Sequence, residues 1–307
     1  MDNKLHISIS PHIHSGASTQ RIMLDVIIAL LPATVAGCIL FGLRALAVVA
    51  VCVVAAVLSE FLFNLIIKKE QTVGDLSAVV TGLLLALNLP ANIPLWQAAV
   101  GSVFAIVIVK CIFGGIGCNL VNPAITARVF MLVAFGTMAK AAFPLDAVSS
   151  ATPLVQLAEG NTPSMLDLFM GNVGGAIGET SALALVIGGV YLLVRRVITW
   201  HIPVAFIGTV FVMSFLLDGF DVMAALLWIL SGGLFLGAFF MATDYVTSPP
   251  TKWGKIIFGI GAGLITILIR FYGNYPEGVS FGILMMNILN PYIESWTPRK
   301  LFGGKNS

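Results

Sequence analysis

Long apolar runs follow one another along the whole chain, separated by short polar connections. The runs lie at residues 22–41, 45–67, 76–89, 95–112, 118–138, 181–194, 202–217, 222–242, 253–271 and 279–293. A helix of about 20 predominantly apolar residues crosses a hydrocarbon layer roughly 30 Å thick. The pattern therefore predicts an all-α membrane protein of about ten transmembrane helices, embedded in membrane lipid.

The composition excludes an ordinary soluble domain. Hydrophobic residues make up 58% of the chain and charged residues 10%, with a mean hydropathy of +1.00. Soluble domains carry roughly 25% charged residues. The formal net charge of +2 arises from basic residues in the connections, so it predicts no nucleic-acid partner.

Successive connections between transmembrane helices lie on alternate sides of the membrane, and basic residues are unevenly distributed between these two sides. If the N-terminus is cytoplasmic, the inner connections carry Lys4, Arg21, Lys68, Lys69, Lys110, Arg195, Arg196, Lys252, Lys255, Arg299, Lys300 and Lys305, and the outer ones Arg44, Lys140 and Arg270. Because short cytoplasmic loops are enriched in lysine and arginine, residues 1–21 and 298–307 are predicted to be cytoplasmic. The connection 139–180 then lies outside the cytoplasmic (inner) membrane.

Neither metal ligation nor cleavage of a signal peptide is expected. The four cysteines lie in or beside apolar runs and form no Cys-x-x-Cys pair, which argues against a zinc or iron–sulfur site within this chain. The first apolar run is too long for the hydrophobic region of a secretory signal, and no small-residue cleavage site follows it. We expect the N-terminal segment to stay attached.

A weak internal repeat relates residues 22–138 to residues 181–297. Asn119, Asn122, Pro123 and Ile125 recur as Asn287, Asn290, Pro291 and Ile293. Five crossings per half would make the second half inverted, and inverted repeats with interrupted helices commonly form a site near the midplane. We therefore expect the four asparagines to line a shared cavity for a flavin or an ion. The alternative is that each Asn-Pro pair only starts a helix.

Three ionisable residues fall inside apolar runs, where an unpaired charge is costly. Asp25 and Glu60 are candidates for an ion path, although Asp25 also suits the first turn of its helix, where a carboxylate complements the helix dipole. Arg128 is the deepest cation and needs either an acidic side chain or a phosphate as its partner.

The outer connection contains Asp146, Ser149, Ser150 and Thr152 before Pro153. This run resembles the Asp-x-x-[Ser/Thr]-Gly-Ala-Thr signature of membrane redox subunits that carry FMN, with Ser150 where the signature has glycine. The resemblance implies a phosphoester between the Thr152 hydroxyl and FMN. Asp146 could serve recognition by the flavin transferase or form a turn, and the two serines could bond the phosphate or only solvate the loop. An ordinary Ser/Thr-rich loop is the alternative.

Further matches lie in order along nearly the whole chain. They are the run Ser10 to Gly16, the run Arg21 to Val26, Leu30 to Ala33, Gly74-Asp75 and the two Asn-Pro runs. Together they resemble the RnfD family, a membrane component of the Rnf ion-translocating electron transport complex, which is a ferredoxin:NAD oxidoreductase. The corresponding membrane component of the sodium-pumping NADH:quinone oxidoreductase is a relative with a longer N-terminal region.

This resemblance implies a subunit that passes electrons through flavin while its complex exports Na⁺ or H⁺. It implies covalent FMN, a non-covalent riboflavin, other Rnf subunits including a second flavinylated one, and a flavin transferase for maturation. The chain alone is expected to contain no complete active site and no catalytic residue. A stand-alone channel or secondary transporter is the alternative that composition and repeat also allow.

Overall fold

The computed structural model describes residues 18–136, 142–143, 152–273 and 277–298. In chain order the first half contains α1 (Thr19–Phe41), α2 (Leu43–Ile67), η1 (Val73–Asp75), α3 (Ser77–Leu87), α4 (Leu95–Val103), the π-helical η2 (Phe104–Cys111) and α5 (Pro123–Ala134). The connection contains α6 (Pro153–Ala158) and α7 (Met165–Met170). The second half contains α8 (Ala182–Val194), α9 (His201–Leu217), α10 (Val222–Leu230), α11 (Leu234–Leu236), the π-helical η4 (Gly237–Met241), α12 (Lys252–Tyr272) and α13 (Val279–Trp296).

Each of the ten apolar runs contains helix, and the chain is an all-α membrane protein as predicted. Among the described residues, α1, α2 and α12 are long and apolar enough to cross a membrane alone. The prediction of full-length crossings is wrong for α3 and α5, which have 11 and 12 residues. At about 1.5 Å per residue they reach only about halfway through the hydrocarbon. Proline and asparagine account for this, because Asn122-Pro123 starts α5 late and Pro90 follows the end of α3.

The run predicted as a single helix at 222–242 is broken. Its two parts, α10 and the continuous α11–η4 segment, meet at an angle of 66°. The break falls at Ser231, Gly232 and Gly233, and Gly232 has a φ of 72°. This left-handed backbone favours glycine, so the sequence permits a sharp turn here.

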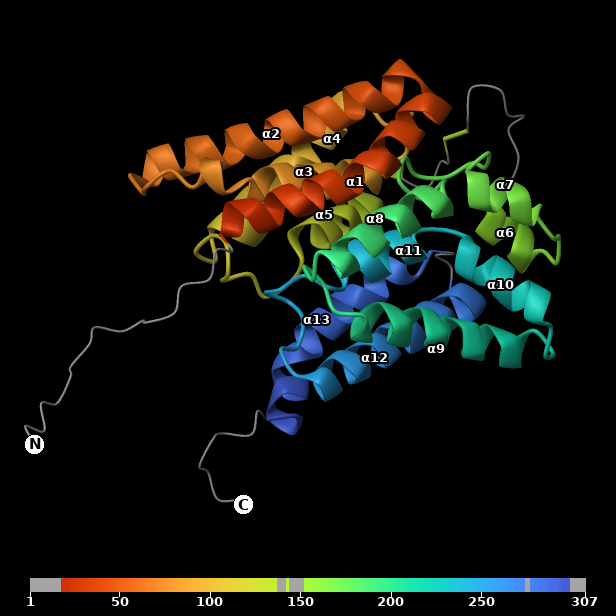
Figure 1. Cartoon of the computed structure of the whole chain (residues 1–307). Helices are drawn as coiled ribbons and strands as arrows, with labels where there is room; N and C mark the ends of the chain where they lie inside the picture. The colour runs from red at the N-terminus through yellow and green to blue at the C-terminus, as the bar shows by residue number, and fades with distance from the viewer. Residues whose placement is uncertain (1–17, 137–141, 144–151, 274–276, 299–307) are drawn as a thin grey trace, which may run out of the picture.

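The helices form two groups that meet along the middle of the bundle (Figure 1). In the first group α2 packs against α3 and α4, and in the second α9 packs against α10 and α12. Across the middle, α1 packs against α8 and α5 against α13. Equivalent helices of two symmetry-related repeats would pair in this way, although the repeat boundaries themselves remain predictions.

Small residues let the two groups approach closely. A Cβ atom on Gly188 of α8 would overlap the carbonyl oxygen of Ala29 on α1. No real side chain can occupy that position, so the α1–α8 contact requires glycine. Close backbone approach through small residues is a usual way for membrane helices to associate.

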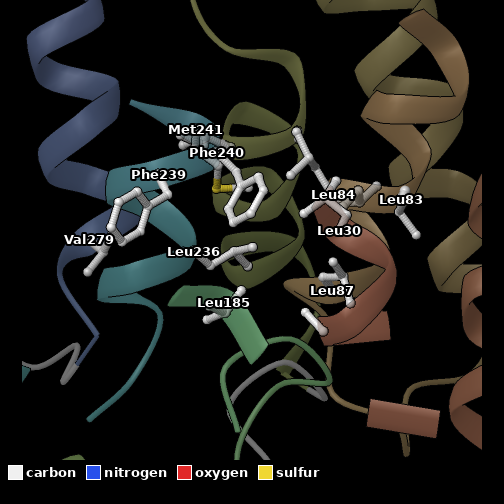
Figure 2. Close-up of a cluster of buried hydrophobic side chains, with 14 of the residues drawn as sticks. Leu30, Leu83, Leu84, Leu87, Leu185, Leu236, Phe239, Phe240, Met241 and Val279 are labelled. Carbon is white, nitrogen blue, oxygen red and sulfur yellow. The ribbon is translucent and has the colours of Figure 1, made fainter. Parts of the chain in front are cut away.

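A cluster of apolar side chains fills the place where the short helices meet. Figure 2 shows that Leu30, Leu87, Leu185, Leu236 and Phe240 converge there from α1, α3, α8, α11 and η4. We call this group of five side chains the apolar plug. All five are at most 6% exposed, so the plug contains no wide polar passage.

The helices α6 and α7 lie at the end of the bundle where α1 ends (Figure 1). A Cβ atom on Gly171, which terminates α7, would lie 3.1 Å from Leu40 near that end. The connection carrying Thr152 is therefore on the opposite end from the start of α1.

Candidate functional site

A cavity of about 370 Å³ lies near the start of α1. Its polar wall includes Ser77, Lys110, Asn119, Asn122 and Asp244, which come from α3, η2, the segment before α5 and the segment after η4. The remaining wall is largely apolar and includes Val26 and Phe240. A mostly apolar cavity with a few convergent polar groups, in the range of about 300–1,000 Å³, is typical of small-molecule and cofactor sites.

Asn122 has two roles in this wall. Its Oδ1 accepts hydrogen bonds from the backbone N–H groups of Ala124 and Ile125, so it caps α5. Its Nδ2 donates to the carbonyl oxygen of Met241 at 3.2 Å. Asn122 therefore starts a helix and also lines the cavity.

Asn287 joins the two halves at the same place. Its Oδ1 accepts from the backbone N–H of Asn122 at 3.2 Å, and its Nδ2 donates to the carbonyl oxygen of Thr247 at 3.0 Å. The side chain is 1% exposed. It therefore supports the cavity from behind and is not part of its lining.

The expectation that Asn290 lines the shared cavity is wrong. Because α13 continues through Pro291, Asn290 stays within the helix and its Nδ2 donates to Glu294 one turn further along. The contact between the two halves at the middle of the bundle is formed by Asn122 and Asn287.

Asn119 is the polar group that most directly suggests a ligand. It lines the cavity, and its Oδ1 is buried without a hydrogen-bond partner in the structure. A buried amide oxygen without a donor costs about 1–3 kcal/mol. A ligand with an N–H or O–H group near this atom would remove that cost.

Glu60 and Lys110 form a buried ion pair beside the cavity. The Lys110 ammonium lies 2.9 Å from one carboxylate oxygen of Glu60 and 2.6 Å from the hydroxyl of Ser77. The hydroxyl of Thr72 donates to the same carboxylate at 2.7 Å. The prediction that Lys110 lies in a cytoplasmic loop is wrong, since it lies in η2 and is 2% exposed. The helix tolerates the charge because Glu60 compensates it.

Asp25 connects α1 to α8. Its carboxylate accepts from the Tyr191 hydroxyl at 2.9 Å and from Arg195 at 3.2 Å. The first-turn interpretation is wrong, because Ser18 caps α1 and the helix already begins at Thr19. Asp25 therefore lies in the second turn and is stabilised by side chains of α8. An ion path through Asp25 or Glu60 stays a prediction.

A second polar site surrounds Arg128, near the end of α12 and the start of α6. It shows which groups in the described chain neutralise this arginine. Arg128 forms ion pairs with Glu179, at 2.7 Å, and with Glu277, and it also donates to Asn88. Its partners in the described chain are thus acidic side chains. Arg270 completes this charged cluster by donating to the carbonyl oxygens of Trp228, Ser231 and Glu277.

Sequence reasoning misses most of the charged cluster. The apolar pattern assigns Arg270 to an outer connection, whereas it lies in the last turn of α12 and is 4% exposed. Glu179 stands out in the sequence only as one of several acids in the connection. The position of Arg270 at the end of an apolar run is the one signal that could have marked it.

Thr152 lies at the N-cap position of α6, directly before Pro153. Its side chain is half-buried and makes no capping hydrogen bond, so the hydroxyl is not used by the helix. Leu154, two residues on, packs against Gly232 beside Arg270. The start of α6 is therefore held next to the charged cluster. Asp146, Ser149 and Ser150 lie outside the described residues.

The two polar sites are linked beside the apolar plug. Asn88, which contacts Arg128, also donates to the Met241 sulfur at 3.6 Å, and the Met241 carbonyl oxygen accepts from Asn122 in the cavity wall. The helix α3 shows the order, because Ser77 borders the cavity, Leu87 lies in the plug, and Asn88 contacts Arg128. From Ser77 to Asn88 the helix rises by about 16 Å.

Comparison with known proteins identifies relatives along almost the entire chain. Residues 6–303 match the model of the NQR2, RnfD, RnfE family. The chain is 52% identical to the D-type subunit of the Na⁺-translocating ferredoxin:NAD⁺ oxidoreductase complex of Acetobacterium woodii, over 97% of this chain and 95% of that protein. It is 42% identical to the D-type subunit of the proton-translocating ferredoxin:NAD⁺ oxidoreductase complex of Clostridium ljungdahlii, over 98% and 97%. It is also 37% identical to the D-type subunit of the ion-translocating oxidoreductase complex of Stutzerimonas stutzeri, over 94% and 93%.

The charged cluster predicts a specific pH dependence of stability. Burial raises the pKa of the Glu277 carboxyl well above its ordinary 4.5, and the nearby Glu179 charge raises it further against the attraction of Arg128. Burial alone would also raise the pKa of Glu179, but Arg128 holds it below its ordinary value. A raised folded-state pKa contributes stability below the unfolded pKa that is lost as the pH rises through the folded pKa.

We therefore expect the thermal unfolding midpoint of the purified protein to fall as the pH rises above 4.5 and through the raised pKa of Glu277, and Glu277→Gln to remove that fall. Glu179→Gln is the matched comparison, because it leaves Arg128 without its ionised partner and should cost about 3–5 kcal/mol. If Glu277→Gln destabilised the protein as much as Glu179→Gln at every pH, Glu277 would be ionised in the folded state and this account would be wrong.

Proposed function

The chain belongs to the NQR2, RnfD, RnfE family, and from this premise we propose that it carries electrons through FMN esterified to Thr152 and through a second flavin in the cavity. It is a membrane subunit of an Rnf complex, an ion-translocating oxidoreductase. The observation that carries the flavin proposal is the placement of Thr152. Its side chain makes no capping hydrogen bond at the start of α6, and α6 packs beside the buried charges of the bundle.

The chemistry at Thr152 requires an accessible hydroxyl on a connection. When the ester forms, the Thr152 oxygen loses its proton and attacks the FMN phosphorus of a flavin dinucleotide, and the bond from that phosphorus to the departing nucleoside monophosphate breaks. The half-buried position and the absence of a capping bond leave that oxygen available. Bound flavin supplies one- and two-electron redox chemistry, while α6 limits how far the ring can move from the bundle.

The cavity has the properties required for a non-covalent riboflavin. Its volume of about 370 Å³ and its mixed wall suit an aromatic ring system with a polar side chain. The unpartnered Oδ1 of Asn119 would accept from an N–H or hydroxyl group of the flavin. Apolar residues such as Val26 and Phe240 would cover the ring.

The complex is proposed to export Na⁺ or H⁺ as electrons pass between ferredoxin and NAD. The relative from Acetobacterium woodii is described as Na⁺-translocating and that from Clostridium ljungdahlii as proton-translocating. Both cover the chain almost completely, so either ion is consistent with family membership. Partners of the chain would be the other Rnf subunits, one of them also flavinylated, and a flavin transferase.

The proposed orientation places both termini in the cytoplasm and Thr152 outside the cytoplasmic membrane. Lys110 is counted among the basic residues of the inner connections and Arg270 among those of the outer ones. Because both are buried in helices, each count falls by one. The excess of basic residues in the inner connections therefore remains. The start of α6, which carries Thr152, and the cavity lie at opposite ends of the bundle, which would place the second flavin toward the cytoplasm.

Covalent attachment predicts that Thr152→Ala abolishes flavin fluorescence of this polypeptide on a denaturing gel, because no other hydroxyl occupies the terminal position of the motif. Thr152→Ser keeps a hydroxyl and should retain part of the label. Both variants should be expressed together with a flavin transferase, and membrane insertion should be unchanged. Fluorescence at the wild-type level in Thr152→Ala would exclude Thr152 as the attachment site.

The second flavin is predicted to depend on Asn119. Asn119→Ala should weaken binding of non-covalent flavin by about 5–150-fold, because it leaves a buried donor of the flavin without an acceptor, which costs about 1–3 kcal/mol. Asn290→Ala is the matched control, because Asn290 also has a buried Oδ1 without a partner but lies outside the cavity. Flavin released by mild denaturation of the purified complex gives the readout, with Thr152 fluorescence as the loading standard. Equal losses in the two variants would contradict the cavity assignment.

The orientation can be tested with an impermeant thiol reagent on intact cells. Glu159→Cys places a thiol on the exposed end of α6 and should react from outside. The native Cys118 is exposed at the opposite end of the bundle and serves as the internal control. It should react only after the membrane is permeabilised, and the reverse pattern would invert the proposed topology.

A further inference from the structure

A second hollow lies on the outside of the bundle and shares only Phe239 with the cavity. It is a groove of about 410 Å³ between α8, α9, α10 and η4. Every residue that lines it is apolar or glycine, including Trp200, Val204, Gly208 and Phe211 on α9. A Cβ atom on Gly208 would meet nothing within 4 Å, so the absence of a side chain there helps to keep the groove open.

The dimensions of the groove fit one extended hydrocarbon chain. From Trp200 to Phe211 the helix α9 rises by about 16 Å, which is close to the depth of one leaflet of a hydrocarbon layer about 30 Å thick. An α-helix of the same length and about 10 Å in diameter would occupy roughly 1,250 Å³. The groove is too small to enclose such a helix, whereas an acyl chain is much thinner.

One end of the groove is strongly basic. Lys255 donates to Thr199, the residue directly before Trp200, at 3.1 Å. The charges of Lys255 and Lys252 both act on His201. The Nδ1 atom of His201 is buried without a hydrogen-bond partner. The basic groups therefore gather at the same end as Trp200, whose ring stacks on His201 with centroids 4.3 Å apart.

The backbone adds to this positive end. Residue Trp200 is the N-cap of α9 and provides no side-chain capping bond. The first N–H groups of α9 therefore lack a side-chain acceptor, and a helix N-terminus favours negative charge. Basic pockets between membrane helices commonly bind anionic lipid head groups.

We propose that this groove is a binding site for an anionic phospholipid, with one acyl chain along α9 and the phosphate against Lys252, Lys255 and His201. The apolar groove accounts for the chain, and the basic end accounts for the negative head group. The inference is independent of the flavin proposal. Phe239 lines both the groove and the cavity, so the bound chain packs against the outer side of the cavity wall.

The test measures quenching of Trp200 fluorescence by brominated lipids in the reconstituted whole complex. The Trp200 signal is the difference between wild type and Trp200→Phe. Brominated phosphatidylglycerol should quench it at a lower mole fraction than brominated phosphatidylcholine with the same acyl chains. Lys252→Gln and Lys255→Gln should each reduce this preference about fivefold, as expected for one basic residue near an anionic head group. Lys69→Gln is the control, because Lys69 bonds Gly114 elsewhere on the chain.

A second pair of variants tests the groove itself. Gly208→Leu fills it and should reduce quenching by both lipids, whereas Val212→Leu, on the same helix but outside the groove, should not. Equal quenching by both lipids in the wild type would show an ordinary lipid boundary and overturn the proposal. Absence of quenching by either lipid would show that a neighbouring protein covers Trp200, which would also overturn it.

Discussion

The fold depends on one constraint, which is that hydrocarbon offers no water to backbone groups freed by a broken helix. The chain breaks its helices repeatedly, and polar side chains from other segments satisfy the exposed carbonyls. Arg270 donates to Trp228 and Ser231 at the break between α10 and α11. Asn122, from the first half, donates to Met241 at the end of η4 in the second half. The break between α10 and α11 is thus satisfied within the second half, whereas the end of η4 is satisfied only when both halves are assembled.

The same constraint explains why the buried charges occur in compensated groups. Glu60 is opposed by Lys110, and Arg128 by Glu179. Removing one member of a buried pair leaves an unpaired charge, which costs more than the pair itself contributes. By contrast, Arg195 is 57% exposed where it meets Asp25. An ion pair that reaches solvent in this way contributes little to stability.

The local amino-acid sequence is sufficient to predict where helices lie and where one of them starts. Apolar runs locate the helices, and Asn122-Pro123 marks a real helix start at the middle of the bundle. Prediction fails where the partner is distant in the chain. A charge near the end of an apolar run is assigned to the neighbouring connection when its partner is unknown, as is the case for Lys110 and Arg270. The partner of Lys110 is Glu60, 50 residues away in the chain. For the same reason the repeat predicts that Asn290 lies at the shared site, whereas in the structure Asn287 contacts Asn122 across the bundle.

The apolar plug has different consequences for electrons and for ions. Electron transfer needs no continuous polar path, so packed apolar side chains do not prevent it. An ion finds no polar ligand among Leu30, Leu87, Leu185, Leu236 and Phe240, whereas Asn88 and Asn122 provide polar groups beside the plug. Two plug residues, Leu236 and Phe240, lie on the short α11–η4 segment that follows the glycine break. Since Asn122 bonds the end of this segment, a movement of the segment that displaces these two side chains would also disturb the contact between the two halves.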